Sequence, residues 1–147
     1  MIPLKEYINR RNITDDFLID KIERFYSYFK LSLINDYAIR MMFIDIAVEF
    51  GEGYVFKTLN YLSKKSKTLI RGKVSTPDFK EEYAMHYLNT KDTYEQFLFV
   101  IRALFNIVEA SSTNYQKLKK IVELFFEKVG GYSSYSSKND SKVIGYV

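Results

Sequence analysis

His86 is the only histidine in the chain, and Glu82 lies four residues before it. Residues four apart are neighbours on one face of a helix, so the Glu82 carboxylate could orient the imidazole. Such a pair could transfer protons near neutral pH, which makes it the enzymatic alternative for this sequence. A histidine with a purely structural role would produce the same pattern, and we favour that interpretation.

Other kinds of reactive site lack the residues they need. The chain has no cysteine, which excludes disulfides, thiolate catalysis and thiolate metal sites. A single histidine cannot supply the paired imidazoles of a di-iron bundle. Gly51-Glu52-Gly53 lacks the third glycine of a dinucleotide-binding loop and follows a helical pattern, so it reads as a helix end. We therefore expect that the protein is not an enzyme and that it has no cofactor, no metal site and no small-molecule substrate.

Positive charge is concentrated between residues 52 and 74, where six basic side chains face a single acidic one, Glu52. Tyr54, Phe56 and Tyr61 alternate with them. Lysines that neutralise phosphates and rings that stack on bases could together bind nucleic acid. A solvated helix end with lysines near its negative pole would have the same composition. The candidate anion-binding residues are Lys57, Lys64, Lys65, Lys67, Arg71 and Lys73. This patch could be extended, if the fold allows, by Lys117, Lys119, Lys120, Arg10 and Arg11.

The composition changes abruptly after residue 131. Residues 132–147 are rich in serine and have no helical hydrophobic period, so we divide the chain into a domain at 1–131 and a C-terminal tail at 132–147. Tyrosines without a core position are suited to interfaces. The tail is therefore a candidate for self-association or partner docking, and a tail without any partner is the alternative. Its candidate contact residues are Tyr132, Tyr135, Val143, Ile144 and Tyr146.

Hydrophobic periodicity and capping residues predict up to seven helices. Asn35 or Asp36 precedes one of them, and Asp92, with Glu95 three residues later, precedes another. Gly51 and Gly53 are expected to end the first of these, and Gly130 with Gly131 the last helix. Residues 68–74 could instead form a short strand. The predicted helices span about 3–10, 14–33, 37–50, 54–71, 77–87, 92–108 and 113–129.

Two of these segments are apolar on nearly every side, which is typical of helices with neighbours all around. They are Tyr37–Phe50 and Phe97–Val108. The remaining segments are apolar on one face only. The predicted fold is therefore an all-α compact bundle of six or seven helices, with two central apolar helices and a short Ser/Tyr-rich C-terminal tail.

Composition also bears on origin and cellular context. The 147 residues carry a net charge of +4, and residue types with A/T-rich codons far outnumber those with G/C-rich codons. This indicates an AT-rich genome and fits a viral or mobile-element protein. No uncharged apolar run is long enough to span a membrane, and no secretory signal is recognisable, so we expect a cytoplasmic protein, in the host cytoplasm if viral.

These observations favour a non-enzymatic helical interaction protein: an adaptor, an inhibitor or an assembly subunit. Its partner would be another protein or a second copy of the chain. The alternative is a nucleic-acid-binding accessory subunit that uses the basic 57–73 segment.

Overall fold

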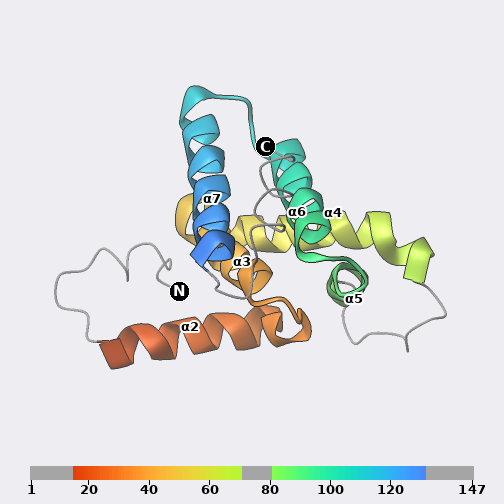
Figure 1. Cartoon of the computed structure of the whole chain (residues 1–147), viewed down its shortest axis with the longest axis horizontal. Helices are drawn as coiled ribbons and strands as arrows, with labels where there is room; N and C mark the ends of the chain where they lie inside the picture. Colours follow the sequence, from red (N-terminus) through yellow and green to blue (C-terminus); the bar gives the residue numbers. More distant parts are fainter. Residues whose placement is uncertain (1–14, 71–80, 132–147) are drawn as a thin grey trace.

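The structure, a computed structural model, describes residues 15–70 and 81–131, and every regular element in these ranges is helical (Figure 1). This confirms the predicted all-α fold. The predicted helix over 3–10, the start of the helix predicted from residue 77 and the tail lie outside the described residues. The elements are α2 (Asp15–Phe29), a 3-10 turn η1 (Leu31–Leu33), α3 (Tyr37–Phe50), α4 (Glu52–Ile70), α5 (Glu82–Leu88), α6 (Thr93–Ile107) and α7 (Ser112–Gly131).

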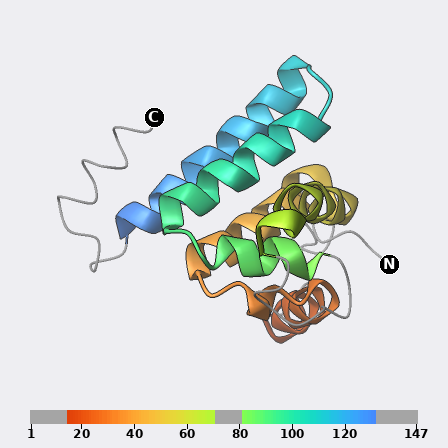
Figure 2. The same ribbon diagram turned by 90° about the vertical axis from the view of Figure 1, so that its right-hand side faces the viewer.

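The last two helices form a hairpin that lies over the others. Figure 2 shows α6 and α7 side by side, with α3, α4 and α5 beneath them and α2 farthest from the hairpin. The rings of Phe97 and Phe125 stack between α6 and α7, with centroids 4.3 Å apart. Offset aromatic stacking of this kind adds to the stabilisation from burial alone.

Helix α3 lies at the centre, in contact with α4, α6 and α7. Its neighbours on several sides explain why it is apolar nearly all round; Ile39, Phe43 and Ile46 are fully buried. Helix α6 also has three neighbours, α3, α4 and α7, and it buries Phe97, Val100 and Leu104. These contacts do not cover α6 on all sides. Phe105, near the C-terminal end of the helix, is 54% exposed.

Aspartates begin both of these helices, as the sequence predicted. Asp36 accepts a hydrogen bond from the Ile39 amide at 3.2 Å, and Asp92 accepts one from the Glu95 amide at 2.9 Å. Each side chain satisfies an amide that has no partner within its helix. Gly51 ends α3 with a φ of 99°, a conformation open to glycine but strained for other residues.

The connections before α3 and α6 are bonded to each other. The Asn89 side chain accepts a hydrogen bond from the Asn35 amide at 2.9 Å and donates one to the Leu33 carbonyl at 2.7 Å. The Thr93 hydroxyl donates to the Asp36 carboxylate. Residues more than fifty positions apart in sequence therefore fix where the two helices start.

Helix ends differ from the predictions at several places. Gly53 was expected, together with Gly51, to end the helix over 37–50, but it lies inside α4, which begins at Glu52 rather than at residue 54. The hydrophobic period suggested one helix through Leu33, but α2 ends at Phe29 because Lys30 adopts a left-handed conformation with φ 53°. Gly130 and Gly131 were expected to stop the last helix, yet α7 continues through both. Glycine permits a left-handed turn without requiring one. In the region where a strand was the alternative, residues 68–70 are helical and 71–74 lie outside the described residues.

Ion pairs fasten α7 to α3. Lys128 Nζ lies 2.8 Å from Asp45 Oδ2, and Lys120 Nζ lies 3.0 Å from Glu49 Oε1. The carboxylates are one turn apart on α3, whereas the lysines are two turns apart in the reverse order on α7. Burial raises the pKa of Asp45, although the bonded Lys128 opposes the shift. The charges therefore hold two helices together at a cost in desolvation.

Candidate functional site

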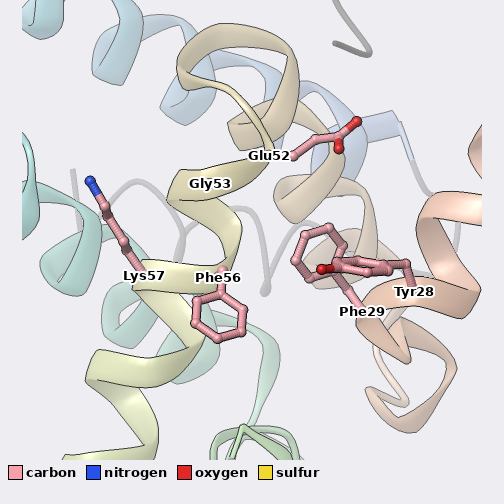
Figure 3. Close-up of a pocket in the computed structure, with 6 residues that line it drawn as sticks. All are labelled: Tyr28, Phe29, Glu52, Gly53, Phe56 and Lys57. Carbon is pink, nitrogen blue, oxygen red and sulfur yellow. The ribbon is translucent and has the colours of Figure 1, made fainter. Parts of the chain in front are cut away.

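An open groove of about 550 Å³ lies between α2 and α4. Figure 3 shows Phe56, from α4, on one side of this hollow and Tyr28 with Phe29, from α2, on the other. Phe29 is buried and forms part of the core, but Tyr28 is 67% exposed and Phe56 is 47% exposed. Large aromatic side chains at this exposure offer apolar surface to a binding partner.

The positions of the aromatic side chains follow from the rotation of each helix. Residues advance by about 100° per position, so a side chain next to a core residue lies at the edge of the core. Phe56 follows the fully buried Val55 on α4, and Tyr28 precedes the buried Phe29 on α2. Sequence reasoning missed this groove. The available signal was an aromatic residue one position away from the core stripe on each of two helices.

Glu52, from α4, also lines the groove, and its negative charge is partly compensated by Lys21 of α2. Lys21 Nζ lies 3.8 Å from Glu52 Oε1, and Lys21 is itself buried. This distance is short enough for an ion pair but too long for a hydrogen bond. Glu52 Oε1 has no hydrogen-bond partner among the described residues. The lining therefore combines an engaged carboxylate with Lys57, whose side chain runs away from Tyr28 and Phe29 (Figure 3).

A basic stripe runs along α4 beside the groove. We use this name for Tyr54, Lys57, Tyr61, Lys64 and Lys65. Their spacing of 3, 4, 3 and 1 residues places them on one face of the helix. The three lysines are exposed, and none of them forms an ion pair with a carboxylate in the part of the chain that the structure describes.

Lysines cover the tyrosine rings of this stripe. Lys57 Nζ lies 4.6 Å from the centroid of the Tyr54 ring, and Lys65 Nζ lies 5.2 Å from that of Tyr61. Both distances are within the range of cation–π attraction. Phe56, the third aromatic residue of the segment, faces the groove instead (Figure 3). Phe56 is thus the aromatic residue of this segment that α4 contributes to the groove, whereas Tyr54 and Tyr61 belong to the stripe.

Helix α7 adds a further lysine to the stripe. Lys117 Nζ lies 5.5 Å from the Phe50 ring centroid, and the Phe50 ring lies 5.6 Å from that of Tyr54. The Phe50 ring therefore links Lys117 to Tyr54 of the stripe. Lys117 was one of the residues considered as an extension of the basic patch. Lys120 is engaged by Glu49, and Lys119 is exposed. Lys67 lies on α4, and Arg10, Arg11, Arg71 and Lys73 lie outside the described residues.

The carboxylate proposed as part of an acid–base pair is occupied elsewhere. Glu82 is buried at the start of α5, and its Oε1 lies 3.4 Å from Lys30 Nζ. No hydrogen bond joins Glu82 to His86 in the described structure. The pairing that the four-residue spacing permitted is therefore not formed.

The predicted contact residues of the tail have no described position. Tyr132, Tyr135, Val143, Ile144 and Tyr146 all lie outside the described residues. Within residues 15–70 and 81–131, no three histidine or acidic side chains gather as a metal site would require. No helix in the same ranges is both long and apolar enough to cross a membrane.

Comparison with known proteins adds no relative from which a role could be transferred. No family model matches the sequence, and neither a curated protein nor a solved structure shows significant similarity to it.

Proposed function

We propose that the protein is a non-enzymatic interaction protein, an adaptor, inhibitor or assembly subunit, that binds a protein partner in the α2–α4 groove. The observation that carries this proposal is the pair of exposed aromatic side chains, Tyr28 and Phe56, on opposite sides of one hollow (Figure 3). Tyrosine and other aromatic residues are enriched in protein interfaces and often supply most of the binding energy.

The charges around the groove specify the chemistry of the partner segment. Lys57 is exposed at the edge and has no carboxylate partner among the described residues, whereas Glu52 is already paired with Lys21. A segment that inserts a bulky apolar side chain between Tyr28 and Phe56 and places an aspartate or glutamate next to Lys57 would complement both features. We therefore expect an apolar anchor flanked by acidic residues.

Selection from a library of short random peptides tests this expectation before any partner has been identified. The library is selected on the full-length wild-type protein alone, and the variants are used only afterwards to measure affinity. We expect a consensus with one large apolar residue beside an acidic one. Synthetic peptides of that consensus should bind Phe56→Ser about 30-fold more weakly, since removal of an anchor contact costs about 2 kcal/mol or more.

Phe105→Ser is the matched control. Phe105 is a comparably exposed phenylalanine on α6, where it contacts Tyr115 rather than the groove. Its substitution should leave peptide affinity unchanged. Peptides that bind both variants equally, or that lack an apolar residue, would contradict the proposal. Sedimentation of the same variants detects a different occupant: a dimer that only Phe56→Ser disrupts would mean that a second copy fills the groove.

A further inference from the structure

We propose that the basic stripe of α4, together with Lys117 of α7, is a second binding surface that contacts the phosphate backbone of a nucleic acid. This surface shares Lys57 with the edge of the groove. Its four ammonium groups come from Lys57, Lys64, Lys65 and Lys117. None of these four forms an ion pair in the described part of the chain, so no carboxylate would have to be displaced.

Aromatic contacts join the lysines into one surface. Lys117, Phe50, Tyr54 and Lys57 follow one another with ring or ring-to-ammonium distances of 5.5, 5.6 and 4.6 Å. Lys65 repeats the arrangement over Tyr61 two turns along α4. From Lys57 to Lys65 the helix advances about 12 Å at 1.5 Å per residue. A surface of this length can contact several phosphates of one strand.

The nearest carboxylates on these elements do not cancel this charge. Glu49 is bonded to Lys120 and is buried, and Glu52 is paired with Lys21 on the other side of α4. The described part of α4 has no acidic residue after Glu52. The stripe therefore keeps a net positive charge that extends over two helices.

The residue types favour nucleic acid over an acidic protein. Lysine is depleted in the cores of protein interfaces, where aromatic residues and arginine provide the energy. A phosphate backbone instead binds ammonium groups as point charges and releases its condensed counterions. Because Lys57 and Lys65 already cover the rings of Tyr54 and Tyr61, the surface presents charge and not free stacking platforms. We therefore expect backbone contact without preference for unpaired bases.

The salt dependence of binding to a duplex oligonucleotide tests this assignment with the full-length protein. The variant Lys64→Gln/Lys65→Gln/Lys117→Gln leaves Lys57 and the groove unchanged. Each phosphate contact contributes about 0.9 to the slope of log affinity against log salt, so the variant slope should be shallower by about 2.7. Between 50 and 200 mM salt, the wild-type affinity should then fall about 40-fold more than that of the variant.

A control with the same change in net charge separates this surface from general electrostatics. Arg24→Gln/Arg102→Gln/Lys119→Gln alters three exposed cations that are not part of the stripe, and Lys119 is turned about 200° around α7 from Lys117. We expect the slope of this control variant to differ from the wild-type slope by less than about 0.9, the contribution of one phosphate contact. An equal flattening in both triple variants would overturn the proposal, as would an unchanged slope in the stripe variant or no duplex binding at 50 mM salt.

Two further ligands distinguish the partner classes. Single-stranded and duplex oligonucleotides with equal numbers of phosphates should bind within about threefold of each other. A preference of more than about tenfold for the single strand would show base stacking and contradict backbone contact. Tighter binding of poly-glutamate than of an oligonucleotide of equal charge would assign the stripe to an acidic protein and overturn the nucleic-acid assignment.

Discussion

The contact between Asp45 and Lys128 predicts that the two partners respond very differently to substitution. Asp45 is a carboxylate held in the interface of α3 and α7, with only 15% of its side chain exposed, and Lys128 is 22% exposed. Lys128→Met leaves the carboxylate buried without its bonded cation. Asp45→Asn removes the charge whose burial is unfavourable and keeps a group of similar size that can accept a hydrogen bond from Lys128.

The expected magnitudes follow from the burial of the pair. Loss of one partner from a fully buried pair costs about 3–5 kcal/mol. Because both side chains retain some exposure, we expect Lys128→Met to lower the free energy of unfolding by about 2–3 kcal/mol. At this chain length that corresponds to a decrease in Tm of about 5–10 °C. Asp45→Asn should cost less than about 1 kcal/mol, and Asp45→Asn/Lys128→Met should be more stable than Lys128→Met alone.

The pH dependence has a definite sign. Burial raises the pKa of Asp45 in the folded state above its value of 3.8, so the folded protein binds a proton more readily there than the unfolded chain. The stabilising contribution of this proton is present below the unfolded pKa and is lost as pH rises through the folded pKa. Without Lys128 the folded pKa is higher still. The deficit of Lys128→Met should therefore be larger at pH 7 than at pH 4, near the unfolded value of 3.8.

Urea unfolding followed by circular dichroism at both pH values measures these differences. Other carboxylates titrate in the wild type and the variants alike and cancel in the comparison. The neighbouring Glu49 and Lys120, which shift the Asp45 pKa in opposite directions, are retained in all variants. Equal destabilisation by Asp45→Asn and Lys128→Met, or a Lys128→Met deficit that does not change with pH, would refute this reasoning.

Other substitutions test the packing and the helix ends, each measured as the free energy of unfolding. Phe125→Ala should cost about 3–5 kcal/mol because it empties a site that is 1% exposed and stacked on α6; a loss below about 1 kcal/mol would contradict the packing of the hairpin. Gly51→Ala should cost about 1–3 kcal/mol from its positive φ alone, since nothing lies within 4 Å of an added Cβ, whereas Gly53→Ala, inside α4 and equally unobstructed, should stabilise by about 0.5–1 kcal/mol. The same sign for both glycines would contradict the assigned end of α3. Asp36→Ala should cost about 2–3 kcal/mol because it removes both the cap of α3 and the acceptor for Thr93, and in a Thr93→Val background that loss should be smaller by at least about 0.5 kcal/mol.

The sequence predicted the parts of the fold that depend on local chemistry. The bounds of α3 agree with the prediction because Asp36 and Gly51 mark its ends, and Asp92 marks the start of α6. Helices α4 and α7 were expected to be apolar on one face only, and each buries such a face: Val55 and Leu59, four residues apart, are buried on α4, and Phe125 is buried on α7. The end of α2 was not predictable, because the break at Lys30 involves neither glycine nor proline.

The candidate site depends on contacts that no local pattern encodes. The sequence shows the basic stripe only as a cluster of basic residues. The contacts of Lys57 and Lys65 with its tyrosine rings, and the approach of Lys117, are seen only in the structure. The groove needs α2 beside α4, and nothing in the spacing of Tyr28 and Phe56 indicates that they meet. Tertiary pairing of this kind lies beyond periodicity and capping.

The bonds made by Asn89 determine where the chain can accept an insertion. The connections 34–36 and 89–92 share hydrogen bonds across the molecule, so lengthening either one would pull the other out of place. The turn at 108–111 is different: its residues are mostly exposed, and Asn114 bonds only to Ser111 and to Glu109 in its own vicinity. A fluorescent label or an epitope placed in this turn would report on the protein without disturbing the junction that organises its helices.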